Sequence, residues 1–383
     1  TKNPTNNPEA YDLYLRGKEF LFRGGKLYFA NAIHQFERAI NLDPDFAQAY
    51  AWLGMAYFQQ SGSKDYLNVN YGDTMKYFAL KALAMDPNLS DGYWLLAEYY
   101  WHLTRNDSSI YYAEKAIEID PNHGLAYQVL GVNYYMIKDF RNALFNLGKA
   151  GKILAGDPDQ FAQNLNWRGT VYMAIGDYKK THEIIEESLN YDKAYGYWGL
   201  WLLNFTKGEF DKSKTYIDSL CALDSTSCLD ALALYYVYSD QIDNLKAGND
   251  KLDLIDHLNN VWKTYVFQKT DQPLEAEKFF NEAYEYLTKT IELQRIDGKG
   301  GLNHYDLAAQ YAFIGKKKES YYILNLMEEK QNLECWMVWW MDYDPRFESM
   351  RDEEEFRAII QRQEKQYTEI RAQIDQLEKA GVI

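Results

Sequence analysis

Apolar residues recur along this chain at spacings of three and four positions, with a small residue at a fixed place in each group. The same phrase occurs three times, as Tyr50-x-x-Leu53-Gly54-x-x-Tyr57, Tyr93-x-x-Leu96-Ala97-x-x-Tyr100 and Tyr127-x-x-Leu130-Gly131-x-x-Tyr134. Spacings of three and four place side chains on one stripe of an α-helix. We therefore predict a helix in each stretch, and we expect the small residue to let a neighbouring helix approach closely.

A second phrase marks where the alternate helices end. It runs from Ala39 to Pro44, from Ala82 to Pro87 and from Ala116 to Pro121, and it closes each time on Asp-Pro. Proline lacks a backbone N–H and pushes the preceding residue out of the helical region, so each Asp-Pro pair predicts a helix stop. The phrase recurs after 43 and then 34 residues (39 to 82 to 116). This period predicts helical hairpins, with a loop insertion around Ser61 to Gly72 in the longer step.

The pattern resembles the tetratricopeptide repeat family, whose consensus is Trp-x2-Leu-Gly-x2-Tyr followed by Ala, Phe, Ala and Pro. Tyr replaces Trp throughout, and the second half of the consensus is matched by Ala32, Phe36, Ala39 and Pro44. The resemblance is specific in residues 10–158, continues more weakly to Ser213 and returns from Leu307 to Ser320. It implies an all-α fold, a right-handed superhelix (α-solenoid) of about eight helical hairpins.

The chain divides by pattern into five segments. Residues 1–9 form a linker, residues 10–225 regular tetratricopeptide hairpins, residues 226–300 irregular helical hairpins, residues 301–343 a late tetratricopeptide-like hairpin with an apolar helix, and residues 344–383 a C-terminal capping helix. The register of the helices in residues 226–300 is not fixed by the pattern.

The last helix has signals of its own. Asp352 and Glu355 form a predicted capping box, apolar residues follow at spacings of three and four from Phe356 to Leu377, and Gly381 ends the helix. One interpretation is a helix that caps the last repeat. The other is a helix that forms a coiled coil between two copies in a homodimer. Polar residues at two core-type positions of such a coil, Glu353 and Gln363, favour the capping helix.

Two flanking phrases narrow the resemblance. The start, Pro4-Thr5-x-x-Pro8-Glu9-Ala10-Tyr11-x-x-Tyr14-Leu15-x-Gly17, and the end, Asp344-Pro345-Arg346-Phe347 to Phe356, resemble segments of TolB-like/tetratricopeptide bacterial signalling regulators. This group includes CadC-type and AraC-type membrane-tethered transcription factors and some adenylate cyclases. The resemblance implies a ligand- or partner-sensing module of a transcriptional regulator, with the effector domain upstream of Thr1. The module would be periplasmic in a tethered regulator and cytoplasmic in a cyclase. The alternative is a free-standing scaffold without an effector.

Net charge argues against one partner class, and the length of the apolar stretches argues against another. The formal charge is −15, whereas a nucleic-acid-binding surface needs a basic stripe. We find no such stripe, and we expect no direct contact of this segment with nucleic acid. No stretch reaches the roughly 18 to 20 apolar residues that span a bilayer, so we expect no membrane insertion by this segment.

Motifs for chemistry are largely missing from the sequence. The six histidines show no zinc-type spacing, and neither phosphate-binding glycine loops nor a Gly-x-Ser-x-Gly elbow occurs. We therefore predict no catalytic residues, no metal and no cofactor. The competing hypothesis is an enzyme in residues 226–300 that uses Asp253, Asp256, His257 and Lys263. A stripe of polar residues along one helix is more often the solvated face of an amphipathic helix.

Cys221 and Cys228 lie near a predicted helix end and the next helix start. A disulfide across this turn is geometrically conceivable and would need an oxidising compartment such as the periplasm. The alternative is two small core residues.

The first helix of each hairpin lines the concave face in tetratricopeptide arrays. Alignment on Tyr50, Tyr93, Tyr127 and Tyr197 predicts that the residues on this face include Tyr14, Lys18, Phe58, Trp94, Glu98, Trp101, Gln128, Tyr135, Asn166, Trp198 and Phe205. Some family members clamp a carboxylate with Lys and Asn on first helices. The positions of that clamp hold Tyr14/Lys18, Ala51/Met55 and Trp94/Glu98 here, so the basic clamp is absent.

The remaining aromatic face suits a protein or peptide segment, with a glycan stacked on the rings as a second option. The competing interpretation is that these rings pack against neighbouring helices and fill the space as core.

Overall fold

The structure is a computed structural model that describes residues 4–23, 26–61, 72–224, 228–245, 254–292 and 302–383. Within these ranges the regular secondary structure is α-helix and short 3-10 helix, without a strand. The chain divides into two compact units, which are described separately here: unit 1 extends to Asn164, and unit 2 extends from Leu165 to Val382. The division falls inside helix α9.

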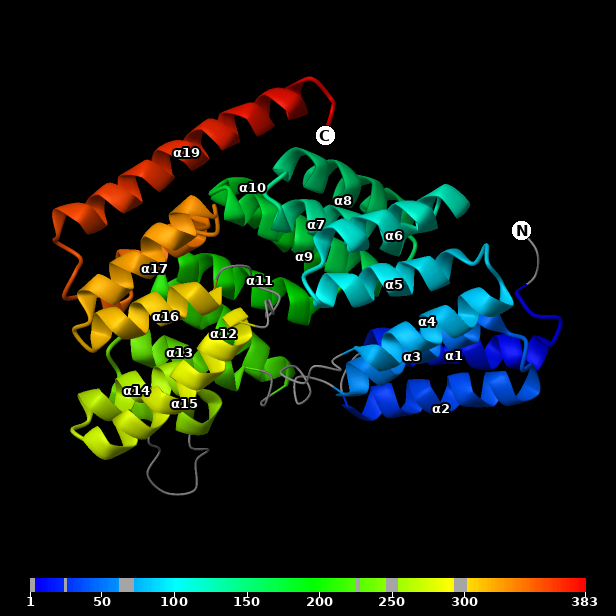
Figure 1. The fold of residues 1–383 in the computed structure, drawn as a ribbon, viewed down its shortest axis with the longest axis horizontal. Coiled ribbons are helices and arrows are strands. Elements are labelled where there is room, and N and C mark those ends of the chain that lie inside the picture. Colours follow the sequence, from blue (N-terminus) through cyan, green and yellow to red (C-terminus); the bar gives the residue numbers. More distant parts are fainter. Residues whose placement is uncertain (1–3, 24–25, 62–71, 225–227, 246–253, 293–301) are drawn as a thin grey trace. The chain divides into compact units, whose positions relative to one another are not determined.

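Unit 1 consists of antiparallel helix pairs (Figure 1). Its helices are α1 (Pro8–Arg23), α2 (Lys26–Leu42), α3 (Ala47–Ser61), α4 (Asp73–Met85), α5 (Ser90–His102), α6 (Asn106–Ile119), α7 (Gly124–Met136), α8 (Phe140–Leu154) and the first part of α9 (Pro158–Ala174). Each odd-numbered helix from α1 to α7 packs on the even-numbered helix that follows it, and the odd-numbered helices also contact one another.

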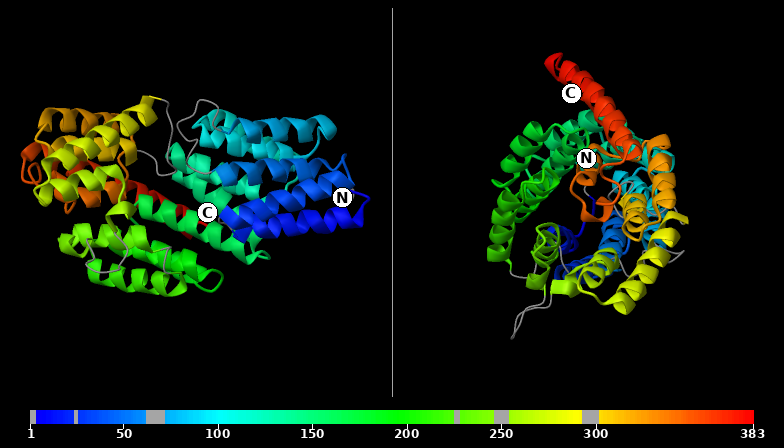
Figure 2. Two further views of the ribbon diagram at one scale, coloured as in Figure 1. Left: turned by 90° about the horizontal axis from the view of Figure 1, so that it is seen from below. Right: turned by 90° about the vertical axis from the view of Figure 1, so that its left-hand side faces the viewer.

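Unit 2 begins with the rest of α9 and contains the remaining helices. They are α10 (Tyr178–Ser188), α11 (Lys193–Thr206), α12 (Phe210–Leu223), α13 (Leu229–Tyr238), η2 (Ile242–Leu245), η3 (Leu254–His257), α14 (Asn260–Lys269), α15 (Pro273–Glu292), α16 (Leu302–Phe313), α17 (Lys317–Glu329), α18 (Cys335–Met341), η4 (Pro345–Phe347) and α19 (Glu354–Lys379). The pairs α11–α12, α14–α15 and α16–α17 pack as hairpins (Figure 2).

Small residues inside the first helices allow the close approach that the sequence predicts. A Cβ atom on Gly54 would lie 2.7 Å from Cβ of Phe78, and one on Gly131 would lie 2.7 Å from Cγ of Leu147. Real Cβ atoms do not approach so closely, so these positions admit no side chain unless the helices separate. The prediction of close helix contact at these positions is confirmed.

A repeated hydrogen bond ties the two helices of a hairpin together. Ser109 Oγ donates to the carbonyl oxygen of Ala97 at 2.7 Å, and Ser213 Oγ donates to that of Trp201 at 3.2 Å. Each serine lies twelve residues after its acceptor. Because both hydroxyls are fully buried, each would be costly to leave without a partner.

The Asp-Pro stops are also confirmed. Helices α4 and α6 end directly before Asp86 and Asp120, both of which have extended backbone conformation. The Asp86 carboxylate then accepts from the backbone N–H of Asn88, and that of Asp120 accepts from Asn122. These two bonds fix the turn that follows the helix. The predicted insertion loop lies mostly outside the described residues.

Helix α19 packs along unit 2 as a capping helix. Its buried side chains are Phe356, Ile359, Ile360, Gln363, Tyr367 and Ile374. Tyr367 donates to the carbonyl oxygen of Leu333, and Arg362 makes a two-pronged contact with Glu328 of α17. Since this stripe is covered within one chain, the packing favours the capping interpretation. A homodimer through this helix stays a prediction.

The predicted capping box at the start of α19 is wrong. The helix begins at Glu354, its N-cap residue is Glu353, and no side chain caps it. The Glu353 carboxylate instead accepts from Lys317 Nζ and from the hydroxyl of Tyr321, both at 2.6 Å. Contacts with α17 therefore fix this end of the helix, where the sequence suggested a local cap.

The phrase Asp344 to Phe347 forms a buried junction in unit 2. The guanidinium of Arg346, whose side chain is 1% exposed, contacts Asp344 at 2.7 Å and Asp306 of α16 at 2.9 Å. The same guanidinium lies 4.0 Å from the ring centroid of Trp262 of α14. Tyr305 donates to Asp344 at 3.1 Å. This junction thus joins α14, α16 and the segment that leads to α19.

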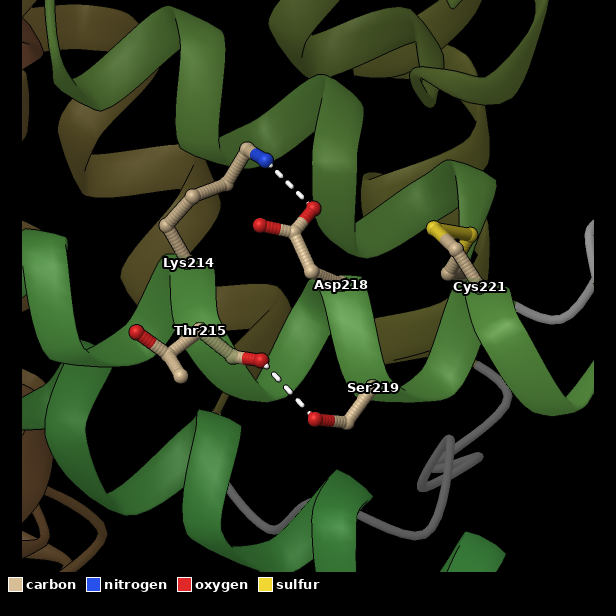
Figure 3. Close-up of a disulfide and its surroundings, with 6 residues drawn as sticks. Lys214, Thr215, Asp218, Ser219 and Cys221 are labelled. Atoms are coloured by element: carbon tan, nitrogen blue, oxygen red, sulfur yellow. Dashed lines mark hydrogen bonds and ion pairs between the residues drawn. A yellow bond between two sulfur atoms is a disulfide. The ribbon is translucent and has the colours of Figure 1, made fainter.

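Cys221 and Cys228 form a disulfide between the end of α12 and the start of α13 (Figure 3). Their Cα atoms lie 5.2 Å apart, in the range that a disulfide requires. One turn earlier on α12, Lys214 pairs with Asp218, and Ser219 donates to the carbonyl oxygen of Thr215. The bridge closes a short loop, with a sequence separation of 7.

We expect the double variant Cys221→Ser, Cys228→Ser to lose about 2–3 kcal/mol of unfolding free energy, because the bridge limits the freedom of the unfolded chain. Denaturant unfolding of unit 2, followed by tryptophan fluorescence, measures the loss. Dithiothreitol should destabilise the wild-type protein by a similar amount and leave the double variant unchanged. Equal stability of the two proteins without reductant would contradict a formed bridge.

Candidate partner-binding face

The odd-numbered helices of unit 1 present the face on which the sequence predicts a binding site. We call it the first-helix face and define it by Lys18, Trp52, Trp94, Glu98, Trp101 and Gln128. Among the predicted residues, Tyr14, Phe58, Trp94, Gln128 and Tyr135 are at most 7% exposed. Lys18, Glu98 and Trp101 are partly exposed. Most of the aromatic side chains that were predicted to line this face in unit 1 are therefore buried in the core.

Three helices of unit 1 meet at Asp91, a position that the sequence did not single out. Its Oδ1 accepts from Nε1 of Trp52 at 3.2 Å and lies 3.4 Å from Nε2 of His123. Nδ1 of His123 accepts from the backbone N–H of Ala126, so the imidazole proton lies on Nε2, facing Asp91. Burial alone would raise the pKa of Asp91, but contacts with His123, Lys18 and Trp52 outweigh it and hold the pKa below the usual value.

Aromatic rings connect this carboxylate to the rest of the face. The ring centroids of Trp52 and Trp94 lie 4.9 Å apart, and Nζ of Lys18 lies 4.2 Å from the Trp52 centroid. Burial lowers the pKa of Lys18, while Asp91 and Asp157 oppose that change. The ammonium is thus held by the face of a ring and the field of nearby carboxylates.

Glu98 and His102 lie one turn apart on α5 and form the other polar part of the face. Glu98 Oε2 is 4.0 Å from His102 Nε2, and their side chains are 16% and 24% exposed. Burial raises the pKa of Glu98 to about 7 and lowers that of His102 to about 3. Phe58 and Trp101 each place a ring centroid 4.4 Å from the His102 ring.

The predicted residues of unit 2 have different surroundings. Phe205 is 1% exposed and packs edge-on against Trp340 of α18, with ring centroids 5.8 Å apart. The hydroxyl of Tyr343 donates to the carbonyl oxygen of Phe205. Asn166 is partly exposed, whereas Trp198 keeps 41% of its surface exposed. Around Phe205 the space next to α11 is therefore filled by the chain itself.

Trp52, Asp91 and His123 are the residues that the sequence analysis missed. The repeat alignment holds a signal for one of them, because the position two before each tyrosine is Gln48, Asp91 and Leu125 in turn. A single acid at an otherwise uncharged repeat position is a reason to look for a buried partner. The partners themselves lie on other repeats and are not visible locally.

The described residues test the predictions on metal and catalytic chemistry only in part. Among them, no group of three or more His, Cys, Asp or Glu side chains is placed to hold a metal ion. Asp253 lies outside the described residues, and the side chains of Asp256 and His257 are not described either. Lys263 lies on α14 with its ammonium 5.4 Å from the ring centroid of Phe279. In the described helices, none is long and apolar enough to cross a bilayer.

Comparison with known families identifies the type of repeat in two stretches of unit 1. Residues 25–61 match the family described as "TPR repeat", and residues 90–123 match the one described as "Tetratricopeptide repeat". These stretches are tetratricopeptide repeats. Tetratricopeptide repeats support a protein-interaction module as the function of this chain. A comparison with curated proteins gave no match.

Solved structures similar to this chain include the following two. A monomeric mutant of IFIT1, solved with m7Gppp-AAAA, is 14% identical, with a TM-score of 0.51 over 85% of this chain and 71% of that one. PilF of Pseudomonas aeruginosa is 16% identical, with a TM-score of 0.39 over 65% of this chain and 96% of that one. The first of these likenesses supports an all-α array of helical hairpins.

Proposed function

We propose that this chain is the partner-sensing module of a bacterial signal-transducing regulator whose effector domain lies upstream. The tetratricopeptide repeats carry the interaction part of this proposal. The two flanking sequence segments support the assignment to a regulator. The second segment contains Arg346, whose buried ion pairs stabilise the fold of unit 2. A free-standing tetratricopeptide scaffold fits the repeats equally well.

The first-helix face of unit 1 is the best candidate for partner contact. Lys18, Glu98 and Trp101 keep part of their surface exposed beside buried rings. A polar atom on this face also lacks a partner: Oε1 of Gln128 is buried without a hydrogen bond among the described residues. Such atoms are costly unless a bound group or water satisfies them. An extended peptide carries both donors and acceptors that would do so.

The disulfide supports an oxidising compartment, because such bridges persist in secreted and periplasmic proteins and are rare in the cytosol. On this ground we propose a periplasmic module, the soluble part of a membrane-tethered regulator. The cytoplasmic alternative would leave these cysteines reduced.

Sequencing the gene upstream of the codon for Thr1 distinguishes the regulator module from the free-standing scaffold. A transmembrane segment preceded by a DNA-binding domain is expected for the regulator. A start codon or cleavable signal within about thirty residues, the usual span of a signal peptide, would leave the scaffold.

Site-specific crosslinking tests the face itself. We expect a photoreactive residue in place of Trp101 to crosslink one partner in cells, and the same residue in place of Tyr322, which is 68% exposed on α17, to give no such product. Equal crosslinking at both positions would contradict a role of the first-helix face.

A further inference from the structure

The carboxyl group of Glu98 lies among aromatic side chains without a cation opposite it. In the described part of the chain, no lysine or arginine lies within ion-pair distance of it, and its nearest titratable neighbour is His102 at 4.0 Å. The Glu98 side chain still keeps 16% of its surface exposed. The group is therefore surrounded by the protein yet accessible to a ligand.

His102 does not neutralise this carboxyl group. The imidazole lies against the rings of Phe58 and Trp101, with both centroids 4.4 Å away. Burial lowers the pKa of His102 to about 3, so the ring is neutral near pH 7. Without a counter-ion, burial raises the pKa of Glu98 to about 7. A carboxyl group in this state gains most from a cation that binds next to it.

Trp94 supplies the polar neighbour that favours the ionised form of Glu98. Its side chain is buried, with the residue 3% exposed. Its indole N–H faces Glu98 closely enough to lower the pKa of the carboxyl group. The indole thus favours the ionised form of Glu98, but it carries no charge that would neutralise the carboxylate.

The neighbouring charges do not already occupy this place. The ammonium of Lys18 lies 4.2 Å from the ring centroid of Trp52, on the side of the face where Asp91 balances it. Asp91 is itself bound by Trp52 and approached by His123. Among the described residues of the first-helix face, Glu98 is the acid that no cation balances.

We propose that Glu98, with Phe58, Trp94, Trp101 and His102, receives an arginine or lysine side chain of the partner segment. We call these five residues the Glu98 site. The proposal rests on the proposed function and names the chemistry of its partner. Aromatic faces attract a cation, the Glu98 carboxylate pairs with it, and the low polarity of the surroundings strengthens both contacts. An apolar side chain would leave the carboxylate without an opposite charge.

Calorimetric titration with N-acetyl-L-arginine amide tests the site on the whole protein. The neutral analogue N-acetyl-L-citrulline amide has nearly the same shape, so it isolates the effect of charge. We expect the wild type to bind the arginine compound at least tenfold more tightly than the citrulline compound. Glu98→Gln should remove this preference, and Glu118→Gln, which breaks an exposed pair with Lys115 on α6, should keep it.

Proton release gives a readout that a structural role of Glu98 would not produce. The carboxyl group is about half protonated at pH 7, because its pKa is about 7. A cation stabilises the ionised form, so binding should release about half a proton per ligand at pH 7 and almost none at pH 9. Titrations in buffers with different ionisation enthalpies measure this number. Circular dichroism checks that Glu98→Gln folds like the wild type.

Several results would overturn the proposal. These are equal binding of the two compounds, an unchanged preference in Glu98→Gln, absent proton release, or binding of choline in place of the arginine compound. The proposed function fails separately. If the Trp101 crosslink to a partner forms equally in Glu98→Gln, the interaction module stands and the cation site falls. If the arginine compound binds as expected but no partner crosslinks, the cation site stands and the interaction module falls.

Discussion

Arg346→Met is expected to destabilise unit 2 by about 3–5 kcal/mol, the usual cost of breaking a buried ion pair from one side. The methionine retains much of the volume but removes the charge between Asp344, which is fully buried, and Asp306. Among the described residues, Asp344 would then keep the hydroxyl groups of Tyr305 and Tyr238 as side-chain partners from other helices. Denaturant unfolding, followed by the fluorescence of Trp262 and its neighbours, measures the loss.

A matched substitution shows whether the loss of stability depends on the burial of the ion pair or on the removal of a charge alone. Arg357→Met removes an equally short pair with Asp342, at 2.6 Å, but the two side chains are 40% and 47% exposed. Exposed pairs of this kind contribute about 0–1 kcal/mol. Similar losses in the two variants would contradict the buried junction as the main support of this part of unit 2. Arg346→Lys should fall between them, because an ammonium cannot form the same fork or stack on Trp262 as well.

The repeated part of the fold could be predicted from the sequence because its signals are local. Gly54 and Gly131 lie on the same stripe as their neighbouring leucines, and Asp86 and Asp120 precede prolines. These features act within one hairpin, so spacing alone reveals them. The structure places a close helix contact at each of these glycines and a helix end at each of these aspartates.

The junction at Arg346 shows the opposite case. The phrase around it is visible in the sequence, but its partners Asp306 and Trp262 lie on α16 and α14, far along the chain. No local spacing connects the three residues. The same holds at the start of α19, where Lys317 and Tyr321 of α17 hold Glu353 and the local capping box does not form.

The candidate face could be placed by repeat alignment, but its accessibility could not. Phe205 and Trp198 were predicted to share one face, yet Phe205 is 1% exposed and Trp198 is 41% exposed. The difference comes from Trp340 and Tyr343, whose position depends on the irregular part of unit 2. In unit 1, Glu98 was identified from its repeat position, whereas the missing counter-ion became visible only in three dimensions.

Phe356→Ala is expected to release α19 from unit 2. The Phe356 ring is fully buried, and its centroid lies 5.3 Å from that of Phe347 in the junction segment. Truncation of a buried phenylalanine costs about 3–5 kcal/mol through lost burial and a residual cavity. Phe356 begins the buried stripe that continues through Ile360 and Ile374, and polar contacts such as that of Arg362 with Glu328 add to it. The partly exposed ion pair contributes too little to compensate for the loss, so the N-terminal part of α19 should open first.

Hydrogen exchange followed by mass spectrometry measures the release. The amides of α19 should exchange at least tenfold faster in Phe356→Ala, while those of α14 and α15 change little. Tyr322→Ala is the control, because it removes an aromatic ring that is 68% exposed on α17, and its effect should stay within about 0.5 kcal/mol. If α19 instead belongs to a coil between two copies, its protection should depend on protein concentration, and Phe356→Ala should shift the oligomeric state in size-exclusion chromatography. A wild type that is monomeric with concentration-independent protection of α19 would leave the capping helix as the explanation, because the apolar stripe that a coil needs is then covered by α17 and α18 of the same chain.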